Sequence, residues 1–204
     1  MNGKRVLITG ASRGIGRALA LAFAAAGYDL VLQYRSNRQA MAETLQSLAS
    51  YDVACQSFAV DLSQETAVED FLGQIGAIDV LVNNAGIAQQ KLFTDITTAE
   101  WDEMFAVDVR AVFWRTKGVL PDMIRRKKGR IINISSIWGL TGASCEVHYS
   151  AAKAAVIGMT KALAKELEPS GITVNCIAPG VVDTDRNAHL SAKELADLAA
   201  EIPA

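Results

Sequence analysis

The sequence is poor in the residues that build disulfide-bonded or metal-binding proteins. Its 204 residues include three cysteines, two histidines and four prolines. Cys55, Cys145 and Cys176 are odd in number, widely spaced and free of any Cys-x-x-Cys pair, so we expect reduced thiols in a cytoplasmic protein rather than disulfides. His148 and His189 have no partner at the spacing of metal ligands, so we expect both to be polar surface residues. No metal site is predicted.

The sequence also lacks a long hydrophobic run and an excess of charge of one sign. The longest apolar stretch, residues 18–27, is about half as long as a transmembrane helix. The N-terminus, MNGKRVLITG, begins a strand pattern at once, so we expect neither a membrane anchor nor a signal peptide. The formal net charge of -2 offers no basic face to nucleic acid. We therefore expect a small-molecule partner.

Short β-branched apolar runs are plentiful, and segments of helical length separate them. The runs span residues 5–10, 29–34, 53–60, 78–84, 129–135 and 171–178. Regular alternation of strand and helix indicates right-handed crossovers and a parallel sheet covered on both faces. Uniformly apolar runs such as VLIT and VLVN fit central strands. The pattern predicts an α/β fold with a doubly wound, Rossmann-like parallel sheet, in a single domain over residues 1–204.

A glycine-rich turn, TGASRGIG, follows the first strand. Gly10, Gly14 and Gly16 stand where the first helix begins. Glycine permits a tight turn and lets backbone N–H groups and the helix N-terminus approach a pyrophosphate. The spacing differs from GxGxxG, and an ordinary strand-to-helix turn explains two of the three glycines equally well. The position beyond the carboxyl end of a strand favours a nucleotide site.

The end of the second strand indicates which nucleotide is bound. Residues 33–37 (QYRSN) lack the carboxylate that accepts hydrogen bonds from the ribose hydroxyls of NAD. Arg35, together with Arg13 from the glycine turn, is suited to clamp a 2′-phosphate. We therefore expect NADP(H) as the cofactor. The alternative interpretation of Arg35 is a solvated loop cation.

Several features occur in one order along the chain: the glycine turn, residues 83–86 (NNAG), Ser136, Tyr149, Lys153, and residues 179–180 (PG). The series resembles the short-chain dehydrogenase/reductase family, and within it the 3-oxoacyl-acyl-carrier-protein reductases, over nearly the whole chain. The resemblance implies an NADPH-dependent enzyme that reduces a ketone, foremost a 3-oxoacyl thioester, to a secondary alcohol. It also implies a homodimer or homotetramer for a full-length chain.

The resemblance also implies which residues bind the cofactor. The glycine turn would hold the phosphates, Asp61 would flank the adenine, and Asn83 would line the ribose side. The full set implied is Thr9, Gly10, Ser12, Arg13, Gly14, Ile15, Gly16, Arg35, Asp61, Leu62, Asn83, Ala85, Gly86, Tyr149, Lys153, Pro179, Gly180, Val182 and Thr184.

The stretch EVHYSAAKAAV places Tyr149 and Lys153 on one face of a helix. Reduction of a ketone by hydride transfer leaves charge on the carbonyl oxygen, so the site needs a proton donor and a second hydrogen bond. A phenol has a reference pKa of about 10, which a nearby ammonium lowers. We expect Tyr149 to be the general acid, Lys153 its electrostatic partner, and Ser136 a donor to the substrate oxygen. Alternatively, Tyr149 is only partly buried and Lys153 extends to the surface.

Asp108 departs from the family pattern, which usually has an asparagine there to support a water chain to the lysine. If its carboxylate is ionised, it competes with Tyr149 for the field of Lys153. We therefore count Asp108 with the catalytic residues and predict activity with an altered pH profile.

Two further departures concern assembly and partners. The basic run at residues 125–128 lies where related reductases dock an acidic acyl carrier protein, although a solvated helix end explains it too. Ser170 stands where a second docking arginine is expected. Family members usually continue beyond the last helical pattern, residues 191–202, into a further helix and strand. The resemblance therefore implies a chain truncated at the C-terminus, with impaired assembly and lowered activity.

The substrate pocket is expected to include Ile137, Trp138, Glu146 and His148, because they flank the serine and the tyrosine. Trp138 and GASCEVHYS resemble a bacterial subgroup that reduces a 5-aminopentanone modification on elongation factor P, where Glu146 would meet an amine. Alternatively, Trp138 packs on the fold and Glu146 is solvated. Outside the enzymes, the alternative is a degenerate NADPH-binding regulatory protein, which Asp108 favours and the intact catalytic trio opposes.

Overall fold

Six parallel strands form one sheet in the computed structural model, which describes residues 3–184 and 193. The strand order is β3-β2-β1-β4-β5-β6, and all five pairings are parallel. This order is the doubly wound arrangement that the sequence predicts. The strands are β1 (Arg5–Thr9), β2 (Asp29–Tyr34), β3 (Cys55–Ala59), β4 (Val80–Asn83), β5 (Gly129–Ile134) and β6 (Ile172–Ile177).

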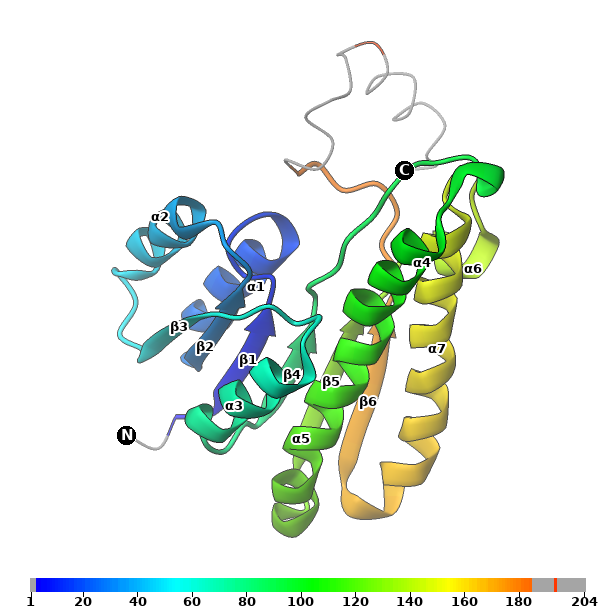
Figure 1. Ribbon diagram of the computed structural model, residues 1–204. Coiled ribbons are helices and arrows are strands. Elements are labelled where there is room, and N and C mark those ends of the chain that lie inside the picture. The colour runs from blue at the N-terminus through cyan, green and yellow to red at the C-terminus, as the bar shows by residue number, and fades with distance from the viewer. Residues whose placement is uncertain (1–2, 185–192, 194–204) are drawn as a thin grey trace.

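Helices cover both faces of the sheet (Figure 1). Val6 and Ile8 of β1 pack in one core with α1 (Gly14–Ala25) and α2 (Arg38–Leu48). Leu7, between them, points to the opposite face because side chains alternate along a strand. It packs in a second core, to which α3 (Glu65–Ile75), α5 (Ala111–Arg126) and α7 (Val147–Leu167) contribute.

A π-helical turn, η2 (Ala106–Arg110), joins α4 (Thr98–Phe105) to α5. The start of α4 is fixed by a capping box, in which Thr97 and Glu100 satisfy each other's backbone N–H groups. π-Helical turns inside α-helices are frequent at functional sites, and this one carries Asp108. The short elements are η1 (Phe93–Asp95), α6 (Trp138–Thr141) and η3 (Glu168–Ser170).

The carboxyl ends of all six strands lie at one edge of the sheet, the upper edge in Figure 1. Within the described residues, no helix is both long and apolar enough to cross a membrane, and no cluster of His, Cys, Asp or Glu is suited to hold a metal ion. The helical pattern expected at residues 191–202 falls, apart from Lys193, outside the described residues, as does His189.

Candidate active site

The glycine turn between β1 and α1 requires all three of its glycines. Gly10 and Gly14 have φ values of 65° and 53°, in the left-handed region that favours glycine. A Cβ on Gly16 would lie 2.1 Å from the carbonyl oxygen of Gly10, and one on Gly10 would lie 2.9 Å from Cα of Ala85. An ordinary strand-to-helix turn would not need Gly16. We call the bare backbone of Gly10, Gly14 and Gly16 the glycine cradle.

Two side chains that sequence reasoning did not assign hold this cradle in place. The Gln33 amide donates to Val60 O at 2.8 Å, and its oxygen accepts from Gly10 N at 3.1 Å. The Asn84 amide donates to Thr9 O at 2.9 Å. Gln33 and Asn84 are polar residues at the ends of apolar strands, and that contrast was the signal available in the sequence.

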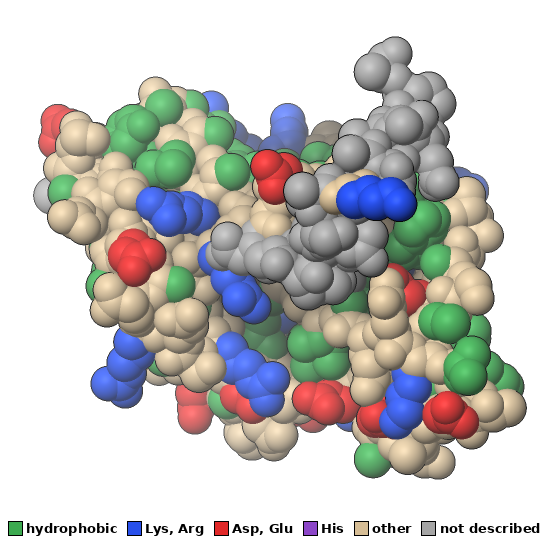
Figure 2. All heavy atoms as spheres, turned by 90° about the horizontal axis from the view of Figure 1, so that it is seen from above, with side chains coloured by type: hydrophobic (Ala, Val, Ile, Leu, Met, Phe, Trp, Pro, Cys, Tyr) green, Lys and Arg blue, Asp and Glu red, His purple; other side chains and the backbone are tan. Residues whose placement is uncertain are grey.

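Arg13 and Arg35 are both exposed at the carboxyl edge of the sheet. Arg35 Nε lies 3.9 Å from Asp61 Oδ2, with both side chains largely in solvent, so this contact is weak. The pKa of Asp61 is lowered, mainly by a hydrogen bond from the Ser63 N–H and to a lesser degree by Arg35. Neither arginine side chain is buried in the core, so both guanidinium groups are accessible to an anionic ligand. Seen from above, Lys and Arg side chains lie interspersed with Asp and Glu side chains over this face of the molecule (Figure 2).

The segment after β6 crosses back to the glycine turn. Pro179 O accepts from Ile137 N at 2.9 Å, and Thr184 Cγ2 would lie 3.5 Å from a Cβ on Gly14. The structure therefore places Thr184, predicted on the nicotinamide side of the cofactor, beside Gly14, predicted on the phosphate side.

The predicted catalytic residues converge at the ends of β5 and α7. Tyr149 and Lys153 are each 5% exposed and Ser136 is 8% exposed. Lys153 Nζ lies 5.5 Å from the Tyr149 ring centre and donates to Ile134 O at 3.3 Å. The alternative in which Lys153 extends to the surface is therefore wrong. Ser136 Oγ accepts from Trp138 N at 3.2 Å, which leaves its hydroxyl proton available to a ligand.

Asp108 forms a buried ion pair with Lys153. Its Oδ2 lies 3.0 Å from Lys153 Nζ, its Oδ1 accepts from Ile87 N at 2.7 Å, and its side chain is fully buried. A Cβ on Gly86 would lie 2.7 Å from Asp108 Oδ2 and 3.1 Å from Lys153 Nζ. Gly86 therefore leaves the space that this ion pair occupies.

Arg115, which sequence reasoning missed, lies fully buried near this pair. Its Nε donates to Asn83 Oδ1 at 2.8 Å, and the Asn83 amide donates to Asn133 Oδ1 at 2.9 Å. Burial lowers the pKa of Arg115 to about 9, and the charge of Asp108 acts in the opposite direction. The signal in the sequence was a cation directly after the apolar run AVFW (residues 111–114), seven residues after Asp108. The same contacts hold the side chain of Asn83 in the core, while its role beside the ribose stays a prediction.

The predicted pocket residues differ in burial. Ile137 is exposed and Trp138 is half-buried against Tyr149 and Met104. His148 is fully buried, with Nε2 3.0 Å from Gln89 Oε1. The expectation of a surface histidine is therefore wrong, because the 87–91 segment covers the start of α7.

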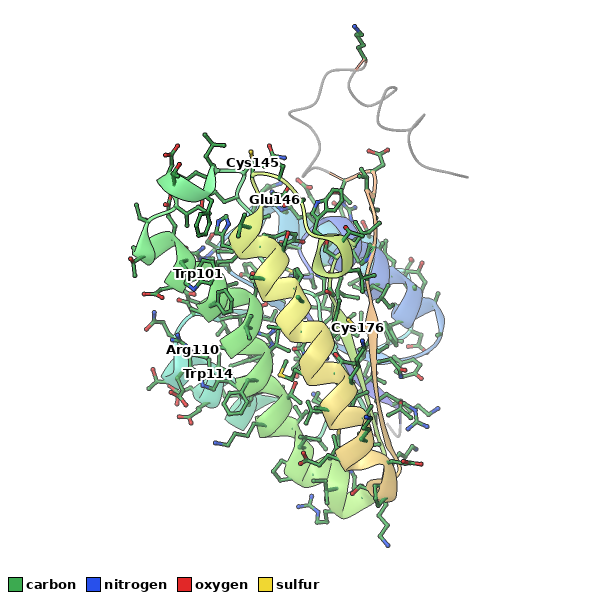
Figure 3. The ribbon with its side chains drawn as sticks, turned by 90° about the vertical axis from the view of Figure 1, so that its right-hand side faces the viewer. Trp101, Arg110, Trp114, Cys145, Glu146 and Cys176 are labelled. Atoms are coloured by element: carbon green, nitrogen blue, oxygen red, sulfur yellow. The ribbon has the colours of Figure 1, made fainter. Side chains whose placement is uncertain are left out.

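Glu146, at the N-terminal end of α7 (Figure 3), is 8% exposed, which corrects the interpretation that it is solvated. Its Oε1 accepts from Gln90 Nε2 at 3.4 Å, whereas Oε2 has no hydrogen-bond partner among the described residues.

The basic run at residues 125–128 lies far from Ser136, and two of its arginines already form ion pairs. Arg126 pairs with Asp79 and Asp122, and Arg125 also pairs with Asp122. The run precedes β5 and Ser136 follows it, so the two are separated by the length of a six-residue strand, about 20 Å. Within one protomer, this basic surface does not border the catalytic residues.

Comparisons with known proteins agree with this geometry. The family model described as short chain dehydrogenase matches residues 4–195. An uncharacterized oxidoreductase of Bacillus subtilis, YmfI, is 44% identical over 202 residues, covering 98% of this chain and 84% of its own length. The 3-oxoacyl-[acyl-carrier-protein] reductase FabG of Aquifex aeolicus is 40% identical over 195 residues, which cover 94% of this chain and 79% of that protein. A crystal structure of 3-oxoacyl (acyl-carrier-protein) reductase from Agrobacterium tumefaciens with NADP bound superposes with a TM-score of 0.89 at 32% identity, covering 96% and 77%.

Proposed function

This chain belongs to the short chain dehydrogenase family of oxidoreductases, and from that premise we propose that it uses NADPH to reduce a 3-oxoacyl thioester to the secondary alcohol. The observation that carries the proposal is the buried trio of Ser136, Tyr149 and Lys153 beside the glycine cradle. The relatives of Aquifex aeolicus and Staphylococcus aureus are named as 3-oxoacyl-acyl-carrier-protein reductases, which supports this substrate class.

The cradle and the exposed arginines fit NADPH. The bare backbone of Gly10 and Gly16 gives the pyrophosphate room that any side chain would fill. Arg13 and Arg35 are placed to hold the 2′-phosphate, and no carboxylate ends β2 to favour the free ribose of NAD. When bound, the cofactor supplies the hydride.

The chain's own residues supply the proton and stabilise the charge that develops. The Ser136 hydroxyl donates a hydrogen bond to the substrate carbonyl oxygen as that oxygen becomes negative, and it keeps its proton. Tyr149 transfers its phenolic proton to the same oxygen, which completes the alcohol and leaves a phenolate. The ammonium of Lys153 stabilises that phenolate electrostatically. The burial of all three side chains excludes bulk water, which strengthens these interactions.

NADPH oxidation with a 3-oxoacyl thioester tests the proposal. Tyr149→Phe is expected to lower kcat by about 10² to 10⁴-fold, since it removes the general acid, while NADPH affinity stays close to that of the unmodified protein. A Tyr149→Phe variant that turns over normally would show that the acid is elsewhere. A chain that binds NADPH but turns over no ketone is the regulatory protein instead.

One observation favours a second substrate class, ketones that carry an amine. Glu146 is buried and its Oε2 has no hydrogen-bond partner among the described residues, so an ammonium group on the substrate would satisfy it. The same assay with an amino-ketone and with its uncharged alkyl counterpart separates the classes. Glu146→Gln is expected to raise KM for the amino-ketone alone; equal effects on both substrates would remove this candidate.

A further inference from the structure

Arg115 is a buried charge that the mechanism above does not use. It is among the largest fully buried side chains of the described residues. Its Nε donates to Asn83, but neither Nη1 nor Nη2 has a hydrogen-bond partner among the described residues. A guanidinium taken out of water costs several kcal/mol unless nearby charge compensates for it. An apolar residue of similar volume at this position would make the fold more stable, so packing alone does not account for the charge.

The compensating charge is that of Asp108. The two residues lie on the continuous helix formed by η2 and α5, seven positions and about 10 Å apart along its axis. Long helical side chains lean toward the helix N-terminus, and Asp108 lies at that end relative to Arg115. The end of β4 and the stretch that follows it bind both of them, since Asn83 accepts from Arg115 and the Ile87 N–H donates to Asp108. Asp108 is also the charge that supports the protonated form of Arg115 against burial.

The other elements packed around this pair contribute few groups that titrate. Among the described residues, α7 presents Lys153 and Tyr149, while β4 and β5 present the neutral amides of Asn83 and Asn133. On β6, Cys176 lies within the influence of Lys153, and burial raises the pKa of its thiol, so it stays neutral. The charges of this cluster are therefore two cations, Lys153 and Arg115, and one carboxylate, that of Asp108; the Glu146 carboxylate at the start of α7 accepts a hydrogen bond from Gln90 instead.

We propose that Arg115 is a positioning residue that offsets the charge of Asp108, so that the field of Lys153 still acts on Tyr149. Without Arg115, Asp108 and Lys153 form a neutral pair, and their effects on a phenolate largely cancel. With Arg115, the cluster keeps one net positive charge, which favours ionisation of the phenol. The inference rests on the proposed function, in which Tyr149 is the acid.

Three variants separate charge from packing. Arg115→Met removes the charge and keeps an unbranched side chain, whereas Arg115→Lys keeps the charge and loses the guanidinium. Lys117→Met removes an exposed cation from the same helix, two residues away, and serves as the control. Two readouts are needed: the pH profile of kcat, and the phenolate absorbance of Tyr149 in the cofactor-free protein, taken as the difference from the matching Tyr149→Phe protein.

Arg115→Met is expected to move both midpoints toward alkaline pH by about 1 unit, the low end of the shift that a single nearby charge produces, because loss of the cation disfavours the phenolate. Arg115→Lys and Lys117→Met are expected to stay close to the unmodified protein. Adding Arg115→Met to Asp108→Asn is expected to return the acid-shifted midpoint of Asp108→Asn toward its starting value.

Unchanged midpoints in Arg115→Met, or equal shifts in Arg115→Met and Arg115→Lys, would overturn the inference and leave Arg115 a packing role. If Arg115→Met does not fold, the comparison of Asp108→Asn with the double variant decides in its place, because these two proteins differ only in the Arg115 charge and both lack the Asp108 carboxylate. The absorbance titration requires no turnover. Midpoints that shift in a protein without ketone reductase activity would therefore refute the proposed function and retain this inference.

Discussion

Replacing Asp108 with asparagine removes a negative charge from behind Tyr149 while nearly preserving the side chain's shape. Asp108 Oδ2 lies 3.0 Å from Lys153 Nζ, and that nitrogen lies 5.5 Å from the Tyr149 ring centre. The carboxylate oxygen is therefore at most about 8.5 Å from the phenol ring, close enough for its charge to disfavour a phenolate.

The size of the effect follows from this distance. At about 8.5 Å and an effective dielectric constant of about 20, a carboxylate and a phenolate repel by about 2 kcal/mol, which corresponds to about 1.4 pH units. Ketone reduction needs the protonated phenol, so the rate falls on the alkaline side as the phenol ionises. Removing the carboxylate favours the phenolate, so Asp108→Asn is expected to move this alkaline limb toward acid by about 1.4 units.

Initial rates of NADPH oxidation across a pH series, at saturating cofactor, measure this limb. Alcohol oxidation needs the phenolate, so its acid limb is expected to move in the same direction. Asp102→Asn, which removes an exposed carboxylate from α4, is the matched control and is expected to leave both limbs in place. An alkaline limb in Asp108→Asn that stays where it was, or that moves toward alkaline pH, would refute the reasoning.

Two further predictions concern the space around the ion pair and the base of the sheet. Gly86→Ala is expected to lower kcat at least about tenfold without loss of folding, because the added Cβ overlaps Asp108 Oδ2 and crowds Lys153 Nζ; steady-state rates and thermal unfolding check this. Asp79→Ala is expected to lower the free energy of unfolding by about 2 kcal/mol at neutral pH, since it removes charge-assisted hydrogen bonds from Arg5 N and Arg126. Burial raises the pKa of Asp79, but these hydrogen bonds outweigh it and lower the pKa overall. The loss of unfolding free energy in Asp79→Ala is therefore complete above about pH 4 and becomes smaller as the pH falls further. Asp52→Ala removes an exposed carboxylate and is expected to show neither the loss nor its pH dependence. Urea unfolding across a pH series measures both proteins.

Local patterns predicted the sheet, the cradle and the trio because each depends on residues that are close in sequence or fixed by strand ends. Tyr149 and Lys153 share a helix, and Ser136 follows a buried strand, so their convergence follows from the parallel topology. Arg115 was missed because its environment is set by side chains from β4 and η2, and a cation in an apolar run can equally well be solvated. His148 was misplaced for a related reason: Gln89, in the segment that covers it, lies 59 positions earlier in the chain.

The buried charges also bear on whether the chain only binds NADPH. A regulatory protein needs the cradle and the exposed arginines, but it gains nothing from Lys153, Asp108 and Arg115 buried together, because such an arrangement is often less stable than apolar residues of the same volume. Lys153 lies against the Tyr149 ring and pairs with Asp108, and buried charges gathered in this way mark a candidate catalytic site. Asp108, which the sequence presented as a reason to doubt catalysis, is thus part of a charge arrangement that supports the proposed acid at Tyr149.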